Sequence, residues 1–221
     1  MTAISFDLSD GVATITIQRP RVRNALNQEA VSELVTILDS LRRITSGAQA
    51  IVLTGSGSAF CSGIDLRSVD LSSANSKQRA HSGLRASLDP VINLLREHRL
   101  PIVAAVNGPA VGAGMSLAVA CDIIVAAEEA FFCPSFISLG FIPDAGIVHQ
   151  LARRIGAGRS LAALLLPERI AAARALEWGL VNAVVPGDDV VSRAQLIGKQ
   201  LAEGPPHAIR TLRSLHECAL T

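Results

Sequence analysis

Two stretches near the N-terminus alternate apolar and polar residues, as strands with one buried face do. They cover residues 3–8 and 12–18 and flank Asp10-Gly11, the strongest short hairpin signal in the sequence. We therefore expect an antiparallel strand pair at the start of the fold.

Apolar residues then recur at helical spacing after Asn27, a residue type that caps helix N-termini. Short apolar runs at 50–53, 103–106, 123–126 and 180–185 have the length of strands. Strands therefore dominate the N-terminal part and helices the C-terminal third, and the length of the chain suits one main domain. Further helices are predicted at 77–98 with a bend at Asp89-Pro90, at 115–121, 146–154, 159–165 and 171–178, and from about Asp188 and Pro206.

The stretch PIVAAVNGPAVGAGMSLAVACD, residues 101–122, predicts a buried strand, a glycine-rich turn and an apolar helix in succession. The first N–H groups of such a helix have no internal partner, so they can donate to an oxygen that gains negative charge. Gly112 and Gly114 equally permit close helix packing, and both interpretations stay open for this stretch alone. The uninterrupted apolar part is shorter than the ~20 residues of a membrane span.

Composition narrows the class of protein. The chain has 221 residues, 49% of them hydrophobic, which suits a globular fold with a large core. Its net charge of +1 indicates no general attraction to nucleic acid or to membranes. The N-terminus resembles no signal peptide, so we expect a cytoplasmic protein. The scattered cysteines Cys61, Cys121, Cys133 and Cys218 predict neither disulfides nor a metal site.

An ordered series of motifs then identifies a family. Arg19-Pro20 with Asn24-Ala25-Leu26-Asn27 is followed by IVLTGSGSAFCSGIDL, by the stretch 101–122 and by SLGFIPDAG. This series resembles the crotonase superfamily, the enoyl-CoA hydratase/isomerase family. The resemblance implies an α/β fold, with a crotonase-like spiral of ββα repeats over residues 1–186 and a short helical C-terminal region over 187–221. Members usually continue with one more helical segment, so we expect a shortened or truncated C-terminal region.

The resemblance also implies a ligand and an assembly. The ligand is an acyl-CoA thioester, in which coenzyme A is part of the substrate, and no cofactor is bound permanently. Neither a metal nor a nucleotide redox cofactor is expected. The assembly implied is a homotrimer or a dimer of trimers.

Site residues follow from the same motifs. The two oxyanion donors are the backbone N–H groups of Ile64 and Ala113. Two of the expected substrate-binding residues, Arg21 and Arg67, have a second interpretation as solvated surface charges. Substrate-binding positions implied by the resemblance are Ser62, Asp65, Leu66 and Arg67 along the CoA and Arg21 near its phosphates. We also expect Gly112 and Phe136 to contact the substrate.

The chain departs from the hydratase pattern at two positions. Ser116 and Phe136 stand where hydratases carry glutamates, and a positioned acid or base typically contributes 10²- to 10⁴-fold to a rate. Asp144 matches the aspartate of isomerase-like members and of a dehalogenating branch that uses it as a nucleophile. Apolar neighbours would raise the pKa of its carboxyl group and make it a better base. Asp144 also suits a helix N-cap, and this interpretation stays open.

We therefore predict an enzyme that shifts the double bond of an enoyl-CoA, with Asp144 as its base. His149 is a weaker candidate for the catalytic group, and His81 and Ser135 could approach the ligand only if their loops do. Two alternatives remain: an acyl-CoA-binding protein without catalytic activity, and an enoyl-CoA hydratase. A serine hydrolase is disfavoured because Gly114-Met115-Ser116 lacks the second glycine of a nucleophile elbow.

Overall fold

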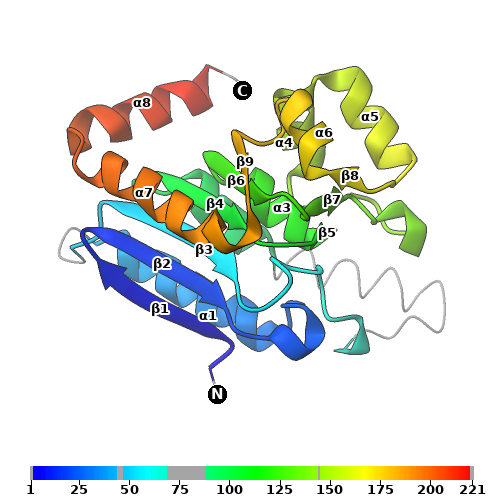
Figure 1. Ribbon diagram of the computed structural model, residues 1–221, viewed down its shortest axis with the longest axis horizontal. Helices are drawn as coiled ribbons and strands as arrows, with labels where there is room; N and C mark the ends of the chain where they lie inside the picture. The colour runs from blue at the N-terminus through cyan, green and yellow to red at the C-terminus, as the bar shows by residue number, and fades with distance from the viewer. Residues whose placement is uncertain (1, 44–46, 69–87, 144, 220–221) are drawn as a thin grey trace.

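The main sheet of the protein has six strands in the order β1-β2-β3-β4-β6-β9, all parallel except β1 (Figure 1). The computed structural model describes residues 2–43, 47–68, 88–143 and 145–219. The fold is mixed α/β, as predicted. The strands are β1 Ile4–Ser9, β2 Val12–Ile17, β3 Ala50–Gly55, β4 Ile102–Val106, β6 Ile123–Ala127 and β9 Ala183–Val185.

The predicted hairpin opens the sheet. Ser9 of β1 pairs with Val12 of β2, which leaves Asp10 and Gly11 as a two-residue turn. Their φ angles are +51° and +75°, the left-handed values that a type I′ turn requires at both positions. The predicted turn and the predicted antiparallel pair are therefore both confirmed.

Two long helices cover the main sheet on opposite faces (Figure 1). Helix α1, Gln28–Leu41, begins at Asn27, whose side-chain oxygen accepts from the N–H of Ala30 at 3.0 Å, as predicted. Helix α7, Val190–Ala202, packs across β2, β3, β4 and β6. The boundary expected at residue 186, between the spiral core and the C-terminal region, stays a prediction. Helix α7 follows this boundary in the chain and packs directly on the main sheet. Helix α8, Pro206–Cys218, comes next in the chain.

A second sheet of three short strands was not predicted. It has the order β5-β7-β8, and its strands have only two or three residues each, which is too short for a periodic signal. The strands are β5 Ala110–Val111, β7 Phe131–Cys133 and β8 Ile170–Ala171.

The remaining helices mostly follow the predicted pattern. Helix α3, Ala113–Val119, begins two residues before the predicted start because the glycine-rich turn already has helical hydrogen bonding. Of the helix predicted at 77–98, residues 88–96 are helical and the part before residue 88 lies outside the described residues. The others are α4 Ile147–Ile155, α5 Ala157–Leu165 and α6 Ala172–Glu177, with 3-10 turns η1 Pro20–Val22, η3 Leu66–Ser68, η4 Ile137–Leu139 and η5 Gly187–Asp189.

Two classes of feature are absent from the described ranges. No helix there combines the length and the hydropathy that a bilayer span needs. In the same ranges, no three or more His, Cys, Asp or Glu side chains gather closely enough to hold a metal ion.

Candidate active site

The two glycine-bearing turns of the chain are joined by backbone hydrogen bonds. Cys61 N–H donates to the carbonyl of Pro109 at 3.1 Å, and Val111 N–H donates to the carbonyl of Cys61 at 3.0 Å. The contact is so close that a Cβ on Gly114 would lie 2.0 Å from the oxygen of Cys61. A Cβ on Gly63 would likewise lie 2.9 Å from the oxygen of Val111. Glycine at 63 and 114 therefore allows the two turns to meet.

This junction places two backbone N–H groups beside the same cavity. Ala113 is the first residue of α3, where an N–H has no intrahelical acceptor. Ile64 lies between two hydrogen bonds to Leu26, one from Leu26 N–H to the carbonyl of Gly63 at 2.7 Å and one from Asp65 N–H to the carbonyl of Leu26 at 2.9 Å. Neither Ile64 N–H nor Ala113 N–H has an acceptor among the described residues. Both can donate to a ligand oxygen.

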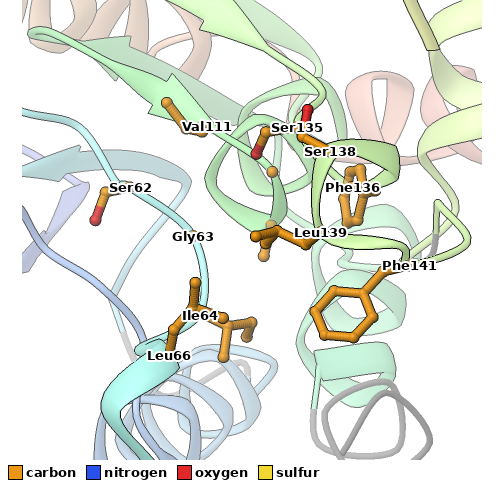
Figure 2. A pocket seen from close by; sticks show the side chains of 12 residues that line it. Ser62, Gly63, Ile64, Leu66, Val111, Ser135, Phe136, Ser138, Leu139 and Phe141 are labelled. Carbon is orange, nitrogen blue, oxygen red and sulfur yellow. The ribbon is translucent and has the colours of Figure 1, made fainter. Parts of the chain in front are cut away.

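The cavity itself is predominantly apolar and has a volume of about 310 Å³. In Figure 2, the segment with Gly63, Ile64 and Leu66 borders one side, and Phe136, Leu139 and Phe141 border the other. None of the described lining side chains ionises. The lining residues are Ser62, Gly63, Ile64, Leu66, Val111, Gly112, Ala113, Ser135, Phe136, Ser138, Leu139 and Phe141.

Most residues expected at the site from the sequence lie together around this cavity. Ile64 and Ala113 line it with four of the predicted substrate-binding residues: Ser62, Leu66, Gly112 and Phe136. Ser135, a weaker candidate, lines it too. Arg21 lies in η1 with an exposed side chain and is not among the lining residues. Asp144 and His81 lie outside the described residues.

Several lining residues had no predicted role. Leu139 and Phe141 belong to the phenylalanine-rich segment, whose composition already indicated a hydrophobic wall. Ser138 is in the same segment, but a serine in a loop carries no signal of its own. Val111 belongs to β5, one of the strands too short to predict.

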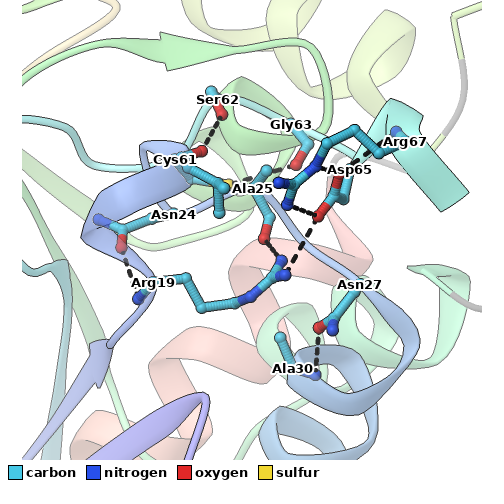
Figure 3. Close-up of polar contacts among 11 residues, drawn as sticks. Arg19, Asn24, Ala25, Asn27, Ala30, Cys61, Ser62, Gly63, Asp65 and Arg67 are labelled. Atoms are coloured by element: carbon cyan, nitrogen blue, oxygen red, sulfur yellow. Dashed lines mark hydrogen bonds and ion pairs between the residues drawn. The ribbon is translucent and has the colours of Figure 1, made fainter.

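The side chain of Asp65 is engaged by two arginines (Figure 3). Arg67 donates from Nε to Oδ1 at 2.9 Å and from a terminal nitrogen to Oδ2 at 2.7 Å, while Arg19 donates to Oδ2 at 3.1 Å. These hydrogen bonds, with that from Arg67 first, hold the pKa of the Asp65 carboxyl far below its usual range. Asp65 is therefore a permanently ionised group within an ion-pair cluster.

Three other side chains of types that can transfer protons are unsuited to this role in the cavity. Ser116 is fully buried, and its hydroxyl lies 3.5 Å from the carbonyl of Gly112 in the preceding helical turn. His149 is exposed on α4 and is not among the described lining residues. Cys61 is buried below the junction, and burial raises the pKa of its thiol to about 12, so it is not a thiolate nucleophile at neutral pH.

Comparison with known proteins places this arrangement in a family. A family model described as enoyl-CoA hydratase/isomerase matches residues 7–220. The chain belongs to this family. The α/β fold also matches solved structures described as enoyl-CoA hydratases, as the crotonase resemblance implies.

Members of the enoyl-CoA hydratase/isomerase family similar to this chain differ in their described reactions. A probable enoyl-CoA hydratase of Rhodobacter capsulatus is 38% identical over 218 residues, covering 99% of this chain and 82% of the relative. The 4-chlorobenzoyl coenzyme A dehalogenase-2 of an Arthrobacter species is 39% identical over 207 residues, covering 92% and 74%. A solved structure described as a monofunctional enoyl-CoA isomerase from M. smegmatis superposes with a TM-score of 0.84 at 28% identity, covering 100% and 94%. Membership alone therefore does not define the reaction.

Proposed function

We propose that this protein binds an enoyl-CoA in the apolar cavity and shifts its double bond toward the thioester, with Asp144 as the base. The observation that carries the proposal is the pair of N–H groups at Ile64 and Ala113, which have no acceptor among the described residues and border an apolar cavity. Such donors suit the oxygen of a thioester that becomes an enolate.

The chemistry of a 3-enoyl-CoA uses these groups in two proton transfers. Asp144 removes a proton from C2, and the electrons of that C–H bond move toward the thioester carbonyl, whose oxygen gains negative charge. The N–H groups of Ile64 and Ala113 stabilise this enolate more than the neutral thioester. The protonated Asp144 then returns the proton to C4, and the double bond ends between C2 and C3. One base is sufficient because the substrate gains and loses one proton.

A hydratase reaction fits the site less well. Hydration needs a group that activates water, but Phe136 has no proton to transfer. Ser116 is fully buried, with its hydroxyl directed to the helix backbone. We therefore rank the isomerase reaction above hydration, and keep acyl-CoA binding without turnover as the second alternative.

The acyl group that suits the cavity is apolar. Phe136 and Phe141 present aromatic rings beside Leu66, Leu139 and Val111, and these side chains favour aliphatic or ring-containing acyl groups. For the CoA portion we propose Arg67, whose side chain is 69% exposed next to the lining residue Leu66, together with the exposed Arg21. Two guanidinium groups complement the negative charges of CoA phosphates.

The test is turnover of a 3-enoyl-CoA, followed by the ultraviolet absorbance of the conjugated 2-enoyl thioester. We expect Asp144→Asn to lower kcat by about 10²- to 10⁴-fold, the usual contribution of a positioned base. Asp7→Asn removes an exposed carboxylate in β1 and serves as the matched control, with kcat unchanged.

The outcomes separate the alternatives. A wild-type rate that Asp144→Asn leaves intact would place the base elsewhere. Net consumption of a 2-enoyl-CoA with formation of a 3-hydroxyacyl product would establish the hydratase. Binding of CoA esters without any turnover would favour the binding protein.

A further inference from the structure

The segment that carries the Ile64 N–H is held by a loop far away in sequence, and Arg19 lies at the centre of this contact (Figure 3). Arg19 follows β2, while Ile64 follows β3 and its glycine-bearing turn. The loop after Arg19 binds the second segment through three backbone hydrogen bonds. Ser62 N–H donates to Arg23 at 2.9 Å, Leu26 N–H to Gly63 at 2.7 Å, and Asp65 N–H to Leu26 at 2.9 Å.

The Arg19 side chain connects both segments with one guanidinium group. One terminal nitrogen donates to the carbonyl of Ala25, which is in its own loop. The other donates to Oδ2 of Asp65 at 3.1 Å, one residue beyond Ile64. The Arg19 side chain is 17% exposed and that of Asp65 8% exposed, so water screens this pair little.

Arg19 is not among the described residues that line the cavity. From this geometry we infer that Arg19 is a positioning residue: it fixes the Gly63–Asp65 backbone so that the Ile64 N–H points at the thioester oxygen. The inference rests on the proposed function, because a positioned donor matters only if an oxyanion forms there.

A positioned donor has a larger effect on the transition state than on substrate binding. Charge develops on the thioester oxygen during proton removal, and small displacements of a donor weaken its interaction with that charge. Arg19→Ala should therefore lower kcat by about 10- to 100-fold and change KM by less than about threefold. Arg19→Lys keeps the charge, but a lysine lacks the planar group that contacts both the carbonyl of Ala25 and Asp65. The kcat of Arg19→Lys should therefore lie between those of Arg19→Ala and the wild type.

A spectroscopic test detects hydrogen bonding by the Ile64 N–H to a thioester carbonyl without any turnover. The probe is a CoA thioester of a substituted cinnamic acid, whose absorbance moves to longer wavelength when hydrogen bonds polarise its carbonyl. We expect a red shift with the wild-type protein, a smaller shift with Arg19→Ala, and an intermediate shift with Arg19→Lys. Arg193→Ala, which removes an exposed arginine on α7, should retain the full shift.

The results distinguish this inference from the proposed reaction. A red shift that Arg19→Ala leaves unchanged overturns the positioning role. A red shift that depends on Arg19, in a protein that does not isomerise 3-enoyl-CoA, supports the positioning role and removes the isomerase. No red shift in the wild-type protein overturns the oxyanion site and the role of Arg19 together. If Arg19→Ala does not fold, Asp65→Asn removes the carboxylate partner and should reduce the same shift.

Discussion

The backbone of Gly114 lies so close to the carbonyl group of Cys61 that any side chain at position 114 would collide with it. A Cβ there would lie 2.0 Å from the oxygen of Cys61, 2.7 Å from its carbonyl carbon and 2.8 Å from its Cβ. Two of these three atoms belong to the backbone, which cannot move aside as the end of a flexible side chain does. The start of α3 and the turn before Ile64 are therefore fixed relative to each other by the absence of one methyl group.

We predict that Gly114→Ala lowers the free energy of unfolding by about 3 kcal/mol or more, because overpacking forces backbone shifts. The same shifts would separate Ala113 from Ile64, so activity or CoA-ester binding should fall with stability. Thermal or urea unfolding measures the first effect. Gly158→Ala on α5 is the control, since a Cβ there meets nothing within 4 Å and alanine favours helix by about 0.5 to 1 kcal/mol. Equal stability of Gly114→Ala and the wild type would contradict the packing account.

Acid should destabilise the protein through His98. This buried ring accepts from Leu100 N–H at 3.1 Å and lies 3.1 Å from the carbonyl of Leu38, to which its other nitrogen donates. Burial is the main cause that lowers the His98 pKa from 6.5 to about 4, and the nearby Arg213 and Arg42 act in the same direction. The unfolded state therefore binds more protons than the folded state between these pH values, so stability falls as pH decreases from 6.5 toward 4.

Below pH 4 the lowered pKa of His98 reduces the free energy of unfolding by about 3 kcal/mol in full. Urea unfolding between pH 4 and pH 7 measures it. In His98→Asn the dependence on pH over this range should flatten, although the variant is less stable at pH 7. His149→Asn, which changes an exposed histidine on α4, should keep the wild-type pH dependence. An unchanged slope in His98→Asn would assign the acid sensitivity to another group.

Removal of the Ser160 hydroxyl should stabilise the protein. Ser160 is fully buried on α5, and its oxygen has no hydrogen-bond partner among the described residues. An unpaired buried hydroxyl is unfavourable by about 1 to 3 kcal/mol, so Ser160→Ala should raise the free energy of unfolding by roughly 1 kcal/mol. Thr54→Val is the opposite case, since the Thr54 hydroxyl donates to the carbonyl of Ala105 at 2.9 Å, and its removal should destabilise by roughly 1 kcal/mol. Urea midpoints that move in the same direction for both variants would refute this distinction.

Ser116→Ala should leave activity within about twofold of the wild type. The hydroxyl is fully buried and directed to its own helix, so it has no role in proton transfer. The measurement is kcat for the 3-enoyl-CoA beside that of Asp144→Asn. A loss of more than about tenfold in Ser116→Ala at unchanged thermal stability would return this serine to the list of proton-transfer candidates.

The elements with clear periodicity were predictable from the sequence. The hairpin at Asp10-Gly11 and the helix capped by Asn27 have local signals, namely a turn dipeptide and a capping side chain, and both are confirmed. The strands of the second sheet have two or three residues each and no local signal. Their pairing depends on contacts that the fold creates.

The candidate site was predictable only in part. Gly112 and Gly114 mark a turn in the sequence, but the meeting of Ile64 with Ala113 was expected from the family resemblance and not from spacing. The ion pair of Asp65 with Arg67 is local, whereas its partner Arg19 lies 46 residues away. No single-sequence pattern links two residues at that separation, so the central position of Arg19 became visible only in the structure.

The packing of α7 also determines when the chain can fold during its synthesis. Gly198 of α7 lies against Val12 of β2, and a Cβ at 198 would be 3.0 Å from that side chain. Ribosomes add about 5 to 20 residues per second, so roughly 10 to 40 seconds separate β2 from the helix that covers it. Once β3 and β4 have also been synthesised, the apolar face that these three strands present to α7 stays without this helix until residues 190–202 are made. A nascent chain that stops before α7 therefore presents an apolar surface of the kind that chaperones bind.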